Sequence, residues 1–283
     1  MINRSLFSLT VVLLLTAASG ASCPQMLRQY APPAPVVFHQ TPTLNEIINV
    51  VNSNSAPIQQ LQTRGATLTV PDLRATLQAD IALQRPRRFR MLARTGFTGT
   101  EMDIGSNDTL FWLWMKQDRP PSVYYCRHDQ FTSVAMGQII PIQPHWLIEA
   151  LGVVHLDPAD RHEGPIASRA GRLEIRSTLS SPSGDITRVM VIDATYGWVL
   201  EQHIYDWRGQ HLASAISSDH RYDPVVGVSL PRRVEIKLPP AQMAFTIDIA
   251  DYVINSLDGD PAQLWTMPQP SGNSLVNLAE GGR

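Results

Sequence analysis

The chain has 283 residues, of which 43% are hydrophobic and 17% are charged, a composition typical of a folded globular protein. Its 23 basic and 25 acidic residues give a formal net charge of -2, without the electrostatic footprint of a nucleic-acid-binding protein. The two cysteines are too few for a scaffold held together by disulfides.

The N-terminal segment has the three parts of a secretory signal peptide. Arg4 precedes an apolar run over residues 6–15, and small residues at 17–22 follow that run. The run is too short to be a transmembrane helix, and a small-residue exit is typical of a cleavage site. Residues 1–22 are therefore predicted to be a signal peptide, and the chain is expected to be exported.

Cys23 directly follows this segment and resembles the cysteine that is lipidated in bacterial lipoproteins. The resemblance implies lipid attachment at Cys23, which would become the first residue of the mature protein. Gly20 departs from the pattern, because such signals usually carry leucine or another aliphatic residue there. Ordinary cleavage after Ala21 or Ser22 is the alternative, and it would leave an exported protein without an anchor.

Residues 23–42 are rich in proline and lack periodicity, which predicts a tether. The next segment predicts a helix, because Thr43 and Glu46 fit a capping box. Its apolar stripe contains Ile47, Ile48 and Val51, and Pro57 bars its continuation. A second, later helix is expected after Pro144, with Trp146 and Leu147 in its apolar stripe.

The rest of the pattern has the period of two that is typical of β-strands. The expected strands cover 77–83, 89–93, 102–104, 109–116, 124–127, 172–179, 186–194, 198–207, 211–222, 232–238 and 243–254. Short turns join most of them, so about eleven or twelve strands should pair as antiparallel neighbours in one large curved sheet. One domain over 43–267 is expected, followed by a disordered tail over 268–283.

The strand over 109–116 is apolar on both faces. Phe111 and Leu113 point to one side, and Trp112 and Trp114 point to the other. A sheet with one face in water would not tolerate this arrangement, so each face of this strand must be covered. Two amphipathic helices are too few to cover so long a sheet, which favours an apolar surface left free for a ligand.

Several segments resemble those of the LolA/LolB-type lipoprotein carriers. They are Trp198–Asp206 with Gly209, Val228–Ile236, Phe245–Ile249 with Val253–Asn255, and, for lipidated members, Arg88–Met91, Asp103–Asn107 and Phe111–Trp114. The resemblance runs from about Thr43 to Asn255 and rests on structural motifs. It implies a mainly β fold, a large antiparallel unclosed half-barrel with helices forming a lid over an apolar concave face.

The resemblance also implies a function. The concave face would hold the acyl chains of a lipid or lipoprotein, without a cofactor or a metal, for sorting or transfer at the cell envelope. A lipidated form would lie at the outer membrane, facing the periplasm, with other envelope proteins as possible partners. The residues expected at the cavity or lid are Ile47, Ile48, Val51, Phe89, Met91, Phe111, Trp112, Leu113, Trp114, Trp146 and Leu147. The family's membrane-inserting loop and ligand-gating arginine cannot be assigned from this sequence.

Two other classes of function stay open. A metal-dependent hydrolase would use the one dense titratable cluster, His155, Asp157, Asp160, His162 and Glu163. Pro158 and Gly164 indicate a solvated loop there, and no G-x-S-x-G nucleophile motif occurs in the chain. The other alternative is a structural envelope subunit that uses the sheet as a docking surface.

Overall fold

The computed structural model describes residues 32–280 except 72–74, 132–144, 170, 182–183, 270–271 and 273. The predicted signal peptide and Cys23 lie outside the described residues. The helices are α2 (Leu44–Ser55), α4 (His145–Ala150) and α5 (Pro261–Leu264), with short 3-10 turns η2 (His128–Gln130) and η3 (Pro239–Ala241). None of the described helices is long and apolar enough to cross a membrane.

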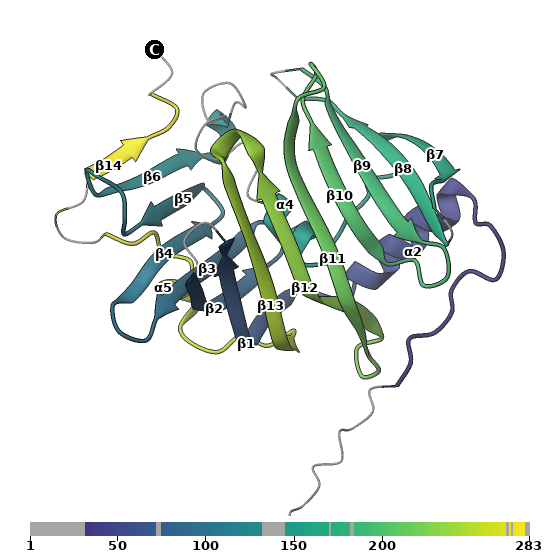
Figure 1. Cartoon of the computed structure of the whole chain (residues 1–283), viewed down its shortest axis with the longest axis horizontal. Helices are drawn as coiled ribbons and strands as arrows, with labels where there is room; N and C mark the ends of the chain where they lie inside the picture. The colour runs from purple at the N-terminus through teal and green to yellow at the C-terminus, as the bar shows by residue number, and fades with distance from the viewer. Residues whose placement is uncertain are drawn as a thin grey trace, which may run out of the picture. The chain divides into compact units, whose positions relative to one another are not determined.

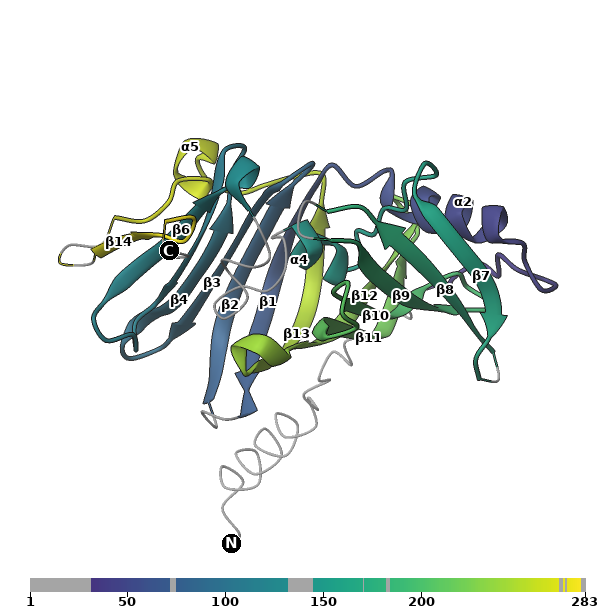
Figure 2. The ribbon, with the colours of Figure 1, turned by 90° about the horizontal axis from the view of Figure 1, so that it is seen from above.

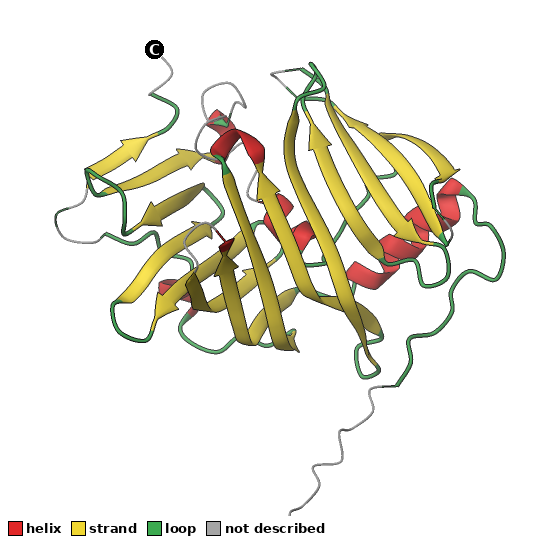
Figure 3. Ribbon diagram, viewed as in Figure 1, coloured by secondary structure: helices red, strands yellow, loops and turns green. Residues whose placement is uncertain are grey.

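The described strands are β1 (Gln60–Val70), β2 (Ala75–Gln84), β3 (Arg88–Thr95), β4 (Gly99–Ser106), β5 (Leu110–Met115), β6 (Ser122–Arg127), β7 (Arg161–Ala167), β8 (Arg172–Leu179), β9 (Ile186–Asp193), β10 (Val199–Tyr205), β11 (His211–Asp223), β12 (Val228–Leu238), β13 (Met243–Ile254) and β14 (Ser274–Asn277). They form a single 14-stranded sheet in the order β14-β6-β5-β4-β3-β2-β1-β13-β12-β11-β10-β9-β8-β7 (Figures 1 and 3). Its two edges, β14 and β7, do not meet, so the sheet is unclosed. The expected half-barrel class is confirmed.

Pairing is antiparallel along the sheet except where β14 lies parallel to β6. The pairing of β1 with β13 joins the early strands to the late ones. Several predicted strands have the observed bounds, including β8 and β13. Short connections between neighbouring strands account for this agreement, because they leave no room for a crossover.

Three strands differ from the expectation. Strand β1 was not among the expected ranges, yet it pairs with β2 and β13. The segment that contains β7 was expected to be a loop, yet it pairs with β8 on both sides of an irregularity at Gly164–Pro165. The tail beyond residue 268 was expected to be disordered, whereas β14 forms there and Leu278 is buried beside Phe111. Strand β14 is stabilised by a distant partner, β6, whereas β7 pairs with the strand that directly follows it. Local composition alone reveals neither pairing.

One face of the sheet, here called the inner face, carries a row of apolar side chains that is interrupted on β10 by Gln202, which pairs with Met190 and Ala215. Residues that pair directly across antiparallel strands share a face. The row runs through Ile175, Met190, Ala215, Ile236, Phe245, Ile247, Leu68, Leu77, Ile81, Met91 and Leu113. Figure 2 shows α2 beside β7 and β8, and α4 nearer the middle of the sheet. Both helices pack against this inner face.

The opposite, outer face is covered by the chain near β3 to β5. Arg90 donates hydrogen bonds to the carbonyls of Gln263 and Leu264 in α5. The Trp112 indole donates to Asp103 at 3.0 Å and lies over Gly105, where a β-carbon would overlap its ring. Both faces of β5 are therefore covered, as its two-sided apolar pattern predicts.

Candidate functional site

Helix α2 is attached to the inner face by apolar packing. Its capping box has formed, because Thr43 Oγ1 accepts from the Glu46 amide at 3.3 Å and the Glu46 carboxylate accepts from the Thr43 amide at 2.7 Å. Ile47, Ile48 and Val51 are buried against β8 and β9. Their partners on the sheet are all apolar, namely Leu173, Ile175, Met190 and Ile192.

The end of α2 is also held by side-chain hydrogen bonds. Asn52 bonds both the amide and the carbonyl of Leu156, each at 2.8 Å. Asn54 does the same with Ser229, at 2.9 and 2.7 Å. These paired bonds join the helix to two distant segments of the backbone. Helix α2 is therefore a fixed cover over its part of the sheet.

Helix α4 lies over the middle of the inner face. Trp146, Leu147 and Ile148 are buried in one core with strands from both halves of the sheet. Gly152, with φ of 95°, ends this short helix in the left-handed region, where glycine is favoured. Helix α4 therefore covers the middle of the inner face.

The inner face beneath α4 contains a buried ion pair. Arg188 of β9 donates to the Glu149 carboxylate at 2.7 Å, and their side chains are only 5% and 10% exposed. Arg188 also donates to the His155 carbonyl at 3.3 Å, and Gln202 of β10 donates to the Glu149 carbonyl at 3.0 Å. Two buried atoms there, Arg188 Nε and Gln202 Oε1, have no hydrogen-bond partner among the described residues. The contact between α4 and the sheet is therefore partly polar, and these two buried polar atoms make no hydrogen bond within the described part of it.

A cavity of about 490 Å³, here called the inner cavity, lies beside this ion pair. Its apolar lining comes from η2, α4 and the strand ends, namely Phe131, Ile148, Val153 and Leu179. Its charged lining includes Arg85, Arg87 and Arg188 together with Glu149, Asp157 and Asp160. The volume lies within the range of small-ligand sites, and the mixed lining suits a molecule with one apolar and one polar end.

The residues expected at a cavity or lid fall into four places. Ile47, Ile48 and Val51 lie on the buried face of α2, whereas the core around α4 contains Phe89, Met91, Leu113, Trp146 and Leu147. Phe111 packs with Cys126 and Leu278 in a separate small cluster. Trp112 and Trp114 alternate with Leu113 and point to the outer face. None of these residues lines the inner cavity.

Sequence reasoning missed Glu149 and Arg188. The alternation in β9 contains the signal, because Ile186, Arg188, Met190 and Ile192 share one face of the strand. A charged residue within an apolar row must find a buried partner. The partner lies on α4, almost forty positions earlier in the chain, and therefore could not be identified from local pattern.

In the titratable cluster of the hydrolase alternative, His162 and Glu163 form local contacts, whereas His155, Asp157 and Asp160 line the inner cavity. The His162 ring bonds Ser177 Oγ at 2.7 Å and the Asp157 carbonyl at 2.8 Å, and Glu163 pairs with Arg161 at 2.6 Å. Within the described ranges, no three His, Cys, Asp or Glu side chains are grouped as metal ligands. Cys126 is a buried free thiol whose pKa is raised by burial, so it is poorly suited to act as a nucleophile.

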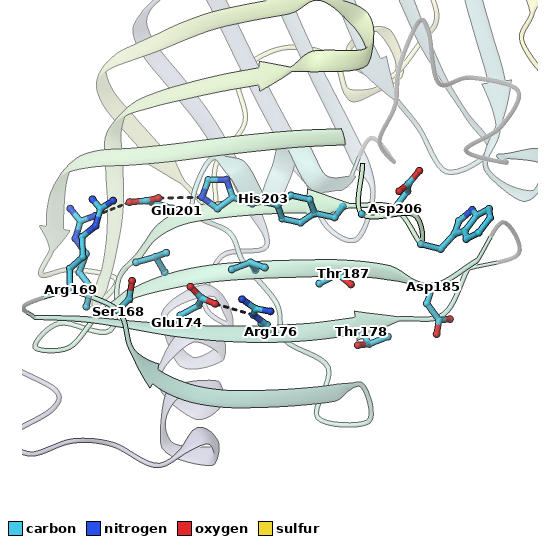
Figure 4. A pocket seen from close by; sticks show the side chains of 16 residues that line it. Ser168, Arg169, Glu174, Arg176, Thr178, Asp185, Thr187, Glu201, His203 and Asp206 are labelled. Atoms are coloured by element: carbon cyan, nitrogen blue, oxygen red, sulfur yellow. Dashed lines mark hydrogen bonds and ion pairs between the residues drawn. The ribbon is translucent and has the colours of Figure 1, made fainter. Parts of the chain in front are cut away.

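A second hollow, here called the outer trough, lies on the outer face over β8, β9 and β10 (Figure 4). Its volume is about 900 Å³. The floor consists of short side chains from β9, and the walls are rows of longer charged side chains from β8 and β10. Figure 4 shows Glu174 paired with Arg176 on one wall and Glu201 bonded to His203 on the other.

No protein-family model matches the sequence, and the comparison with curated proteins found no significant match. Solved structures do match in fold. A DUF1329 family protein from Desulfovibrio piger has a TM-score of 0.52 at 10% identity, over 78% of this chain and 98% of that one. A domain assigned to outer membrane lipoprotein sorting from Vibrio parahaemolyticus has a TM-score of 0.50 at 10% identity, over 77% and 95%. The chain has a LolA/LolB-like fold.

A LolA superfamily protein from Nitrosomonas europaea has a TM-score of 0.49 at 12% identity, over 80% of this chain and 98% of that one. At such low sequence identities, the similarity to these structures describes the path of the backbone and not the side chains of a site. The inner cavity and the buried ion pair beneath α4 must be argued from the residues of this chain. The lining of that cavity combines apolar side chains with arginine, histidine and carboxylate side chains.

Proposed function

We propose that the protein binds acyl chains of a lipid or lipoprotein on the inner face, beneath α4, for transfer at the cell envelope. The observation that carries the proposal is the polar contact of α4 with an otherwise apolar face, beside a cavity of about 490 Å³. The Vibrio parahaemolyticus domain of similar fold is assigned to lipoprotein sorting, which supports the same class of cargo. On this proposal the protein acts by binding and not by catalysis.

Energetics support a displaceable α4. Breaking a buried ion pair costs about 3–5 kcal/mol, whereas burying an acyl chain contributes about 0.8 kcal/mol for each methylene. A chain that buries about four to six methylenes would therefore offset the loss of the Glu149–Arg188 contact. Shorter amphiphiles would leave α4 in place.

The test is recovery of bound lipid. The Cys23→Ala chain, whose own anchor is absent, is purified without detergent, extracted and measured by mass spectrometry. Acyl lipid near one molecule for each chain is expected. Leu179→Glu, which places a charge at the inner cavity, should lose most of that lipid.

The matched control is Leu275→Glu, because Leu275 is 55% exposed on β14 and does not line the inner cavity. It should retain the lipid. A chain that carries no lipid, but that copurifies with an equimolar protein, would instead support the docking-surface alternative and overturn carriage.

Membrane contact is part of the same proposal. Phe97, in the turn between β3 and β4, is fully exposed. Burial of a phenylalanine side chain contributes about 1.5–3 kcal/mol, so this tip would favour insertion into a bilayer. The residue also gives a candidate for the apolar loop that the sequence alone could not place.

Flotation with vesicles of phosphatidylethanolamine and phosphatidylglycerol tests this contact in the Cys23→Ala background. Phe97→Ser should lower the bound fraction severalfold. Val225→Ser is the control, since Val225 is 91% exposed in another hairpin. An equal loss in both variants would mean that Phe97 has no special role.

The anchor itself is proposed at Cys23, with the protein at the outer membrane facing the periplasm. Growth with a labelled fatty acid should label the wild-type chain and leave Cys23→Ala unlabelled. Label in both proteins, or in neither, would contradict lipidation at Cys23.

A further inference from the structure

The outer trough has a defined chemical character. Its floor is the outward row of β9, Thr187, Val189 and Val191, whose side chains are shorter than those of the flanking strands. Neighbouring strands are spaced by about 4.8 Å, so walls on β8 and β10 leave a channel about 10 Å wide between their backbones. This width suits one extended polymer chain that lies along the strands.

Aromatic rings follow β10 along the trough. Trp207 lines one end and is 59% exposed, with the Arg208 guanidinium 4.5 Å from its ring centre. Tyr205 and His203 line the same wall. Figure 4 shows the labelled His203 on the wall across the trough from Arg176.

The trough continues beyond Glu201 into a second hollow of about 600 Å³, which shares Arg172 and Glu201 with it. Trp198 lies there between Tyr196, at 4.4 Å, and His220, at 4.8 Å, with nearly parallel rings. Burial lowers the pKa of His220 to about 4, so this stack is uncharged at neutral pH. A row of π systems thus spans the outer face from Trp198 to Trp207.

We propose that the outer trough binds a neutral oligosaccharide chain. Sugar rings present an apolar C–H face that packs on aromatic rings, and hydroxyls around the rim that need both donors and acceptors. The walls supply both kinds of group in fixed positions, because Arg172 bonds Glu201 at 2.7 Å and Arg176 bonds Glu174 at 3.0 Å. A neutral amide such as an N-acetyl group would find the same partners.

The balance of charge favours a neutral ligand. Three arginines line the trough against two glutamates and two aspartates. The second hollow adds Asp193 and Asp219 to its shared lining. A polyanion such as nucleic acid or an anionic lipid surface would meet no net attraction there.

The backbone excludes the usual mode of peptide capture. An extended peptide binds a sheet by adding to an open edge. Strands β8, β9 and β10 are each paired on both sides, so their amides and carbonyls are already used. Recognition in the trough must therefore come from side chains and rings, which is the mode expected for a glycan.

The proposal is tested by calorimetric titration of the purified full chain with two neutral probes, the tetramer of N-acetylglucosamine and maltotetraose. Saturable binding of at least one is expected. Trp207→Ala should weaken it about fivefold, by loss of ring stacking. The double variant Glu174→Gln with Arg176→Gln should weaken it about tenfold, because charge-assisted hydrogen bonds are lost.

A matched pair of residues provides the control. Arg233 and Glu235 of β12 form the same kind of exposed pair, at 3.3 Å, outside the trough. Arg233→Gln with Glu235→Gln should leave the affinity unchanged, and all variants should retain acyl lipid. No binding of either sugar, equal loss in the control pair, or tighter binding of the acidic probe tetragalacturonate would each overturn the proposal.

Discussion

Helices α2 and α4 cover the same face of the sheet, but they are attached to it in different ways. Helix α2 rests on four apolar side chains and is fixed by the paired hydrogen bonds of Asn52 and Asn54. Helix α4 is half as long and places Glu149 over a buried arginine. On the proposed function, α2 maintains the fold, whereas α4 is the element that a ligand would displace.

The strongest test of this difference is Glu149→Ala. It leaves Arg188 buried without its carboxylate, so the free energy of unfolding should fall by about 3–5 kcal/mol. Urea titration followed by tryptophan fluorescence measures the change. A decrease in the free energy of unfolding of less than about 1 kcal/mol would mean that the pair contributes no more than a solvent-exposed ion pair.

The double variant Glu149→Leu with Arg188→Met extends the test. Apolar replacement of both partners should recover most of the stability, because neither charge is then buried alone. The same variant should recover less acyl lipid, since α4 would rest on an apolar surface that a lipid must compete for. Recovery of stability together with unchanged lipid would show that α4 is not the displaceable element.

Ile47→Ala is the corresponding change in α2. Ile47 is fully buried, and its truncation should cost about 2–5 kcal/mol through lost contacts and a residual cavity. Lipid recovered per folded chain should be unchanged, because Ile47 lies away from the inner cavity. If the lipid recovered per folded chain decreases together with the free energy of unfolding, α2 and α4 do not have separate roles.

Local patterns predicted the parts of the fold that depend on local contacts. The capping box at Thr43 and Glu46 predicted the start of α2, and the alternation over Met243–Ile254 predicted the whole of β13. In both cases the deciding interactions join near neighbours in the sequence or across a short turn. Such interactions are visible in one segment of sequence.

Two missed features depend on partners far away in the chain. Strand β14 pairs with β6, which lies some 150 residues earlier, and Arg188 finds its carboxylate on α4. The cavity residues were uncertain for a related reason. A leucine or phenylalanine in the core has the same alternation as one that lines a hollow, so the prediction of Phe89 and Met91 at a cavity or lid stays a prediction; both are buried on the inner face with α4.

Asn52→Ala should have a smaller effect than Ile47→Ala. The change removes both bonds to Leu156 and leaves a part-buried amide and carbonyl without partners, at a cost of about 1–3 kcal/mol. Hydrogen exchange should then be faster at the Leu156 amide, while α4 is unaffected. Unchanged exchange at Leu156 would show that α2 is held by its apolar side chains alone.

Thr43→Ala should have the smallest effect, and the effect should depend on pH. Loss of the N-cap costs about 1 kcal/mol at neutral pH. Hydrogen bonds from the Thr43 amide and hydroxyl lower the pKa of Glu46 from its ordinary value of 4.5. A lowered pKa in the folded state means that this contribution is present above pH 4.5 and is lost as the pH falls through the folded value.

Wild type and Thr43→Ala should therefore differ most in stability at pH 7 and approach each other near pH 3, as measured by urea titration at each pH. A difference that stays constant over this range would mean that the threonine hydroxyl acts without Glu46, and that the capping box contributes nothing beyond a simple cap.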